Sequence, residues 1–196
     1  MSRAAGSALL MCLLVMVVAL MLGLSGARIA LQEERAARND RDRKTAFQAA
    51  EAALLDAQRD IEQPAGASPR AALLASAAPA FPAGCGTGAA NPLLGLCAGQ
   101  DIAPAWLAVD FRDEGEATMR SIAYGRFTGQ AMPAGGGALP ARRPRYLIEA
   151  YPDRRAGSSA DLAGAGTLYR ISAVGFGAQE DTRVLLQAWY RRAGGG

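Results

Sequence analysis

The chain has 196 residues, of which 51% are hydrophobic and 20% are charged, a size that fits one membrane segment and one modest soluble domain. The formal net charge is only +3 and basic residues alternate with acidic ones, as in RNDRDRK, so no nucleic-acid-binding face is predicted. The sequence contains no histidine, which excludes the commonest general base and metal ligand and every Ser–His or Cys–His nucleophile pair.

The first predicted element is a membrane helix over residues 8–27. These residues carry no charge and no proline, and roughly 20 apolar residues cross a hydrocarbon core of ~30 Å as a helix. A cleaved export signal is the alternative, because Ser25, Gly26 and Ala27 have the small-x-small pattern of a cleavage site. We favour a retained anchor, because the apolar run is longer than the roughly 7–15 residues usual in such signals and only Arg3 precedes it.

The sequence gives two conflicting indications of how this anchor is oriented in the membrane. Positive residues are concentrated on the cytoplasmic side of a membrane segment, and here one precedes the segment whereas six follow it: Arg28, Arg35, Arg38, Arg41, Arg43 and Lys44. This rule predicts a cytoplasmic domain. A disulfide between Cys85 and Cys97 requires an oxidising compartment instead.

An amphipathic helix is predicted over residues 28–63, as a continuation of the anchor. The stretch RIALQEERAARNDRDRKTAFQAAEAALLDAQRDIEQ has no glycine or proline and is rich in strong helix formers. Steps of three and four residues place five apolar side chains on one face, which we expect to dock on a sheet: Phe47, Ala50, Leu54, Ala57 and Ile61.

Residues 64–118 are predicted to be a variable connecting region with a cysteine loop. Ala, Gly, Pro and Ser dominate it up to Gln100, with one short helix expected at 70–78. Cys85 and Cys97 bracket the loop GTGAANPLLGL, which a disulfide would stabilise by about 3 kcal/mol in an oxidising compartment. Two free thiols are the alternative, and Cys12, inside the apolar run, is expected to act as a small hydrophobe.

Residues 119–196 are predicted to form an antiparallel sheet of four strands. Four β-like runs occur in order, TMRSIAYGRF, RYLIEAY, TLYRISAVGF and TRVLLQAWYRR, and the last two are joined by a loop of hairpin length, GAQED. Apolar side chains alternate in the second and fourth runs, which is typical of strands with one buried face. The predicted fold class is α+β, with the amphipathic helix covering one face of the sheet.

This plan resembles the type IV pilins and the pseudopilins of type II secretion, in which an apolar helix continues as an amphipathic helix packed on an antiparallel sheet. The stretch LQEERAARNDRDRKTAFQAAEAALLDAQ, residues 31–58, closely resembles the N-terminal signature of PilX-type pilus assembly proteins, a run like ERMAGNxRDRxxAFQAAEAAL after the membrane segment. The end, YRISAVGFGAQEDTRVLLQAWYRR, resembles the closing hairpin of that family. Residues 64–166 carry no usable resemblance.

The resemblance implies a structural role, as a minor pilin in a tip or priming complex that initiates assembly of a type IV pilus. It implies that a prepilin peptidase cuts after Gly6, so that residues 1–6 are the leader, and methylates the new first residue, Ser7. Residues 7–27 then form a single-pass anchor in the inner membrane, with the C-terminal domain in the periplasm, which agrees with the disulfide and overrides the charge count. The implied partners are the peptidase, other minor pilins and the major pilin, in a hetero-oligomer at the pilus tip or the filament base.

The sequence departs from the major pilins at one position. Those pilins carry a glutamate at the fifth mature residue, which is thought to pair with the terminal amine of a neighbour, and counting from Ser7 this position is Met11. Without the glutamate the subunit gives its own amine to a partner below but receives none from above. We therefore hypothesise a terminal place in the complex, similar to that of the glutamate-free pseudopilin that caps type II secretion pseudopili.

Two other functions compete with this interpretation. One is a type II secretion pseudopilin of the same build, and the other is a membrane-anchored adhesin or binding protein whose variable middle is the contact surface. An enzyme with a cofactor or a metal is not expected, because the chain has no glycine-rich nucleotide loop and no paired-carboxylate motif in a suitable setting. The acidic turn DFRDEGE and the RRPR stretch at 142–145 are better interpreted as solvated loops than as sites for calcium, through Asp110, Asp113, Glu114 and Glu116, or for anionic surfaces.

Overall fold

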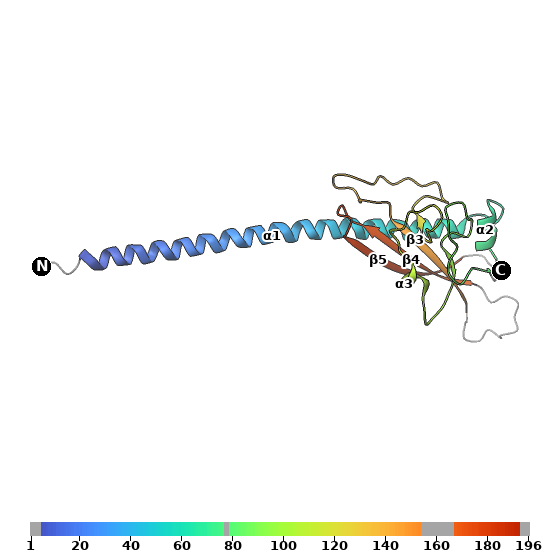
Figure 1. The fold of residues 1–196 in the computed structure, drawn as a ribbon, viewed down its shortest axis with the longest axis horizontal. Helices are drawn as coiled ribbons and strands as arrows, with labels where there is room; N and C mark the ends of the chain where they lie inside the picture. Colours follow the sequence, from blue (N-terminus) through green and yellow to red (C-terminus); the bar gives the residue numbers. More distant parts are fainter. Residues whose placement is uncertain (1–4, 77–78, 154–166, 193–196) are drawn as a thin grey trace. The chain divides into compact units, whose positions relative to one another are not determined.

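The computed structural model describes residues 5–76, 79–153 and 167–192, and Figure 1 shows their arrangement along the chain. The molecule divides into two compact units, Met1–Arg41 and Asp42–Gly196. Its elements, in order, are α1 (Ala5–Glu62), α2 (Pro69–Leu74), β1 (Leu96–Ala98), α3 (Ala105–Ala108), β2 (Ile122–Ala123), β3 (Arg145–Pro152), β4 (Thr167–Phe176) and β5 (Arg183–Arg191). The predicted α+β class is confirmed.

Helix α1 is one unbroken element of 58 residues. It ends at Glu62, just before Pro64, because proline has no backbone N–H to donate and its ring clashes with the preceding turn. Its apolar first part lies in the first unit, and residues 42–62 belong to the second unit, where they pack on the sheet. The predicted continuation of an apolar helix into an amphipathic one is therefore confirmed.

The sheet has five strands and is mixed, which corrects the predicted antiparallel sheet of four. Its order is β1-β3-β4-β5, with β2 also paired to β3. The β3–β4, β4–β5 and β2–β3 pairs are antiparallel, whereas β1 runs parallel to β3, with Cys97 opposite Glu149. The parallel strand comes from the region predicted to be connecting loop. Its three residues are too few to show an alternating pattern.

The first predicted strand is much shorter than its sequence suggests. Of the run TMRSIAYGRF, only Ile122 and Ala123 pair as β2. Gly125 then adopts a φ of +78°, and its backbone oxygen accepts a hydrogen bond from Gly129, which closes a turn. The chain leaves the sheet at this glycine because a positive φ is incompatible with continued strand geometry.

The core between helix and sheet is built on small residues. Five alanines of α1 are buried, Ala46, Ala49, Ala50, Ala53 and Ala57. The last two belong to a cluster that includes Ile148 and Ile171 of the sheet. A Cβ on Gly175 of β4 would lie only 2.0 Å from the Ala46 carbonyl oxygen and 2.4 Å from the Ala50 nitrogen. The helix backbone thus approaches the strand more closely than any larger side chain allows.

The expected docking face is rotated in the structure. Ala50, Ala57 and Ile61 are fully buried and Leu54 is half-buried, but Phe47 is 43% exposed. The physical reason is the close approach at Gly175, because alanines fit between helix and strand whereas a phenyl ring does not. The prediction that Phe47 belongs to the docking face is therefore wrong.

A second, smaller core covers the opposite face of the sheet. Leu147, Val174 and Phe176 point away from α1 and pack against Val109 and Phe111, together with the two cysteines of the disulfide. The segment that carries α3 lies over this face (Figure 1). The sheet is consequently buried on both sides at β3 and β4, whereas every second residue of β5 stays exposed.

Candidate functional site

The N-terminal part of α1 has the composition of a membrane anchor. From Ala8 onward the helix contains a window with mean hydropathy 2.8, none of it buried inside the protein. Met11, the position of the absent glutamate, lies in this part and is 69% exposed. The backbone of Gly6 and Ser7 is helical. This length and hydropathy are compatible with a single-pass anchor.

Three aspartates on the sheet-facing side of α1 hold loops that have little regular structure. Asp42 accepts hydrogen bonds from the backbone N–H groups of Ala178 and Gln179, in the loop between β4 and β5. Asp56 accepts bonds from the N–H of Gly125 and the hydroxyl of Thr128. Each carboxylate is at most 7% exposed, and each therefore ties a distant loop to the helix.

The third aspartate, Asp60, forms a buried ion pair with Arg70. The arginine Nη2 lies 2.7 Å from Asp60 Oδ2, and the side chains are 3% and 1% exposed. Arg70 also donates to the carbonyl oxygens of Pro92 and Leu94, and the Tyr146 hydroxyl donates to Asp60. This pair joins α1, α2, the cysteine loop and β3. Burial, with the Asp60 charge as a second cause, raises the pKa of Tyr146 well above its usual value.

Sequence reasoning did not select these aspartates, although a signal for them exists. Asp42, Asp56 and Asp60 fall at helical spacing on the same stripe as the buried alanines. A carboxylate on an apolar stripe is costly unless it is paired, so this spacing indicates bonds to another segment. The local sequence pattern does not indicate which segment supplies the hydrogen-bond donors.

The Cys85–Cys97 disulfide is present, as predicted. The disulfide itself packs on the helix-free face of the sheet, where Cys97 of β1 is fully buried, whereas Leu94 and Leu96 of the loop belong to the core on the helix side. Backbone bonds hold β1 beside β3, because Gly99 donates to the Ala150 carbonyl and Ile148 donates to the Gly95 carbonyl. Cys12 is a free thiol in the apolar part of α1.

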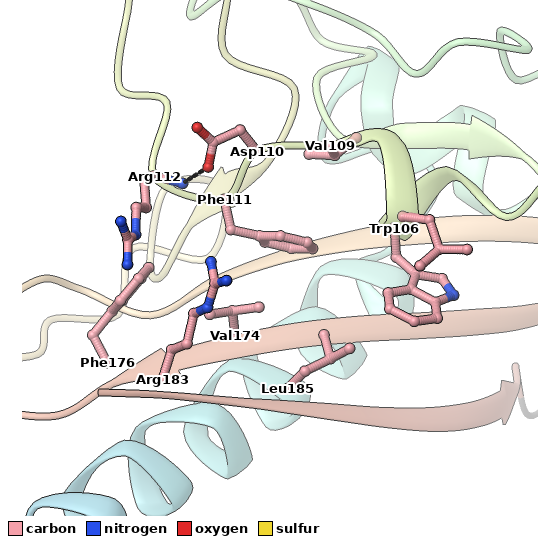
Figure 2. Close-up of a pocket in the computed structure, with 10 residues that line it drawn as sticks. Trp106, Val109, Asp110, Phe111, Arg112, Val174, Phe176, Arg183 and Leu185 are labelled. Atoms are coloured by element: carbon pink, nitrogen blue, oxygen red, sulfur yellow. Dashed lines mark hydrogen bonds between the residues drawn. The ribbon is translucent and has the colours of Figure 1, made fainter. Parts of the chain in front are cut away.

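A pocket of 370 Å³ opens on the helix-free face, between the α3 segment and the last two strands. Its apolar walls come from Trp106, Leu107, Val109, Phe111, Val174, Phe176 and Leu185. In Figure 2 the Phe111 ring lies over Val174, with Trp106 and Leu185 at one end of the pocket and the guanidinium groups of Arg112 and Arg183 at the other. The hollow is thus apolar along its length and basic at one end.

A buried carboxylate positions the α3 wall of this pocket. Glu149 of β3 is fully buried, forms a bidentate pair with Arg170 at 2.8 and 3.0 Å, and accepts the backbone N–H of Ala105 at 2.9 Å. Because Ala105 is the first residue of α3, this bond fixes Trp106 next to it. Arg170 also lies over the ring of Trp189, with its guanidinium carbon 5.5 Å from the centroid.

Two carboxylates of the acidic turn that precedes β2 accept hydrogen bonds within the turn. Asp110 accepts the N–H of Arg112, and Asp113 accepts the N–H of Gly115 and the hydroxyl of Thr118. Glu114 lies 4.0 Å from Arg142. Among the residues that the structure describes, no three His, Cys, Asp or Glu side chains gather in a way that could hold a metal ion.

Comparison with known families gives two matches that together span most of the chain. The profile described as type IV pilus assembly protein PilX C-term matches residues 62–192, and the PilX N-terminal profile matches residues 5–55. No curated protein and no solved structure matches this chain.

Proposed function

The chain belongs to the PilX family of type IV pilus assembly proteins, and from this premise we propose that it is a minor pilin that joins a tip or priming complex to initiate pilus assembly. Its role in that complex is structural and non-catalytic. Its partners are the other minor pilins, the major pilin and a prepilin peptidase.

The observation that carries this proposal is the single helix that begins as an apolar rod and ends as part of a folded domain. Residues 7–27 are uncharged, and the same helix then buries alanines against the sheet in residues 46–57. A helix of this kind stays in the membrane until other apolar helices replace the lipid around it. The domain that follows it is then available for contacts with neighbouring subunits.

Maturation is proposed to occur at the start of this helix. The peptidase removes residues 1–6 by cutting after Gly6 and methylates Ser7. The domain lies on the periplasmic side of the inner membrane, a compartment in which the Cys85–Cys97 disulfide persists. The matured subunit then leaves the membrane for the tip or the base of the filament.

Mass spectrometry of the mature N-terminus tests the proposal. The protein isolated from membranes is expected to begin at N-methylated Ser7, and a Gly6→Val variant is expected to keep its leader. The matched control, Ala27→Phe, alters the competing signal-peptidase site and should leave the Ser7 start unchanged. A mature chain that begins at Arg28 would refute the proposal, because the anchor would then be lost before assembly.

The absence of a glutamate at Met11 supports a terminal place for the subunit. A buried carboxylate in an apolar filament core is costly unless a neighbour's amine lies beside it. The nearest acidic residue after Ser7 is Glu33, far beyond the fifth mature position. The subunit is proposed to sit where no further subunit has to donate its amine from above.

A further inference from the structure

Strand β5 ends the sheet with an open edge. It is last in the strand order, has nine residues, and pairs with β4 on one side only within the described part of the chain. Its outward-facing residues, at alternate positions from 183 to 191, are all exposed. An open edge of this length offers unpaired backbone N–H and C=O groups to a strand from another chain.

An apolar surface lies beside this edge. Leu107 is 66% exposed, Trp189 is 56% exposed and Leu185 is 38% exposed, and Leu107 and Leu185 both line the 370 Å³ pocket. We define the β5 groove as this pocket together with the outward face of β5 and Trp189. Its volume is at the low end of the range of ligand pockets and suits a large side chain rather than a cofactor.

The charges around the groove favour an acidic occupant. Arg112 and Arg183 line the pocket with one carboxylate, Asp110, so the lining has an excess of one positive charge. Arg183 has no ion pair with any residue that the structure describes. Among the described residues the Arg112 guanidinium forms one ion pair, with Asp181 at 3.4 Å, and that aspartate is 97% exposed. An incoming carboxylate would therefore find an uncompensated guanidinium at the groove.

A second copy of this chain fits the edge poorly. Antiparallel pairing of two β5 strands about Gln187 would place Arg183 of each copy opposite Arg191 of the other. Like charges directly opposite each other destabilise a strand pair. In this register the charges disfavour self-pairing and favour a partner strand of opposite sign.

We propose that the β5 groove binds an extended acidic segment of another pilus subunit. The segment adds a strand at the open edge of β5, places a large apolar side chain against Leu185 at the pocket mouth, and places a carboxylate against Arg183. This inference rests on the proposed function in that the partner is a pilus subunit. It adds the surface that is used and the chemistry of the segment that occupies it.

Photo-crosslinking in cells that assemble the pilus tests this inference on the full chain. A benzoylphenylalanine at Leu107, on the rim of the groove, is expected to crosslink to another pilus subunit. Mass spectrometry should map the crosslink to an extended segment that contains Asp or Glu. The same probe at Gln130, an exposed loop residue near Asp56 on the helix side, is the matched control and should not reach that segment.

Charge variants of Arg183 separate recognition from simple proximity. Arg183→Glu is expected to lower the crosslink yield on the order of tenfold, and Arg183→Lys to retain it. Replacing the mapped carboxylate of the partner by arginine should restore the yield with Arg183→Glu. That restoration also shows that the variant folds, since an unfolded chain would not regain the contact.

Several results would overturn the inference. The crosslink from Leu107 could be absent, or it could go to a second copy of this chain, to lipid or to a protein outside the pilus. The mapped segment could lack a carboxylate, or the crosslink yield could be the same whichever charge residue 183 carries. The N-terminal measurement keeps this failure separate from failure of the proposed function. A chain that begins at Ser7 but gives no crosslink refutes the groove alone, whereas a start at Arg28 refutes the minor-pilin role.

Discussion

Three aspartates of α1 connect the helix to other segments of the second unit. The connections between the strands have little regular structure, and the one between β2 and β3 is rich in glycine and proline. Asp42 and Asp56 accept hydrogen bonds from the backbone of two separate loops, and Asp60 accepts them from the Arg70 side chain of α2. Charge-assisted bonds of this kind are roughly twice as strong as neutral ones. At the residue scale, one side of α1 therefore combines buried alanines with buried aspartates that accept hydrogen bonds from other segments.

The buried Asp60–Arg70 pair predicts a large loss of stability when one partner is removed. Asp60→Asn leaves a guanidinium that is 3% exposed without a charge partner, so unfolding should become about 3–5 kcal/mol easier. Denaturant unfolding of the full chain in detergent measures this. Glu51→Gln, on the exposed side of the same helix, is the matched control and should change stability little. An equal loss in both variants would contradict the role given to the pair.

Tyr169 predicts a loss of stability at alkaline pH. Its buried hydroxyl donates to the Leu74 carbonyl at 2.7 Å, and burial raises the pKa of Tyr169 to about 12 from 10.0. The folded state therefore prefers the neutral phenol. Its contribution is fully present below pH 10 and is lost as the pH rises from 10 towards 12, because the unfolded chain deprotonates first. Thermal unfolding of Tyr169→Phe should lack this part of the decline, and an unchanged pH profile would refute the assignment.

At the element scale, the helix and the long strands could be predicted because their signals are local. Composition predicted α1, and alternation predicted β3 and β5. The side of α1 that docks could not be predicted from the helix alone, because Phe47 and the alanines both recur at helical spacing. Only the absence of a side chain at Gly175, far away in sequence, decides between them. Strand β1 was not predicted for a similar reason. Its pairing with β3 and its disulfide place it in the sheet, and its own sequence pattern does not indicate either.

The close packing of α1 on β4 predicts that Gly175 does not tolerate a side chain. A Cβ there meets the backbone of Ala46 and Ala50, which cannot rotate away as a side chain would. Gly175→Ala should destabilise the full chain by about 1–3 kcal/mol, in the range of overpacked cores. Gly84→Ala is the matched control, because a Cβ at Gly84 meets nothing within 4 Å. Equal denaturation midpoints for the two variants would contradict the packing described.

At the scale of the whole molecule, the chain joins an apolar helical segment to a folded domain. The apolar segment could be predicted from sequence because an uncharged run over residues 8–27, of a length compatible with a membrane span, is a local signal. The β5 groove could not, because Trp106, Arg112 and Leu185 come from separate segments that the fold alone brings together. The involvement in pilus assembly follows from the family, and the place that we propose within the pilus rests on the residue at position 11.

The missing carboxylate at Met11 gives a prediction about that place. If the subunit is terminal, no neighbour's amine lies beside residue 11, and Met11→Glu buries an unpaired charge among apolar helices at a cost of several kcal/mol. Met11→Glu should then reduce co-purification with the other minor pilins and lower the number of pili per cell, counted by electron microscopy. Met11→Leu keeps the apolar character and is the matched control, expected to behave like the wild type. Unchanged complex formation and piliation with Met11→Glu would argue that an amine does reach this position, and the subunit would then be internal rather than terminal.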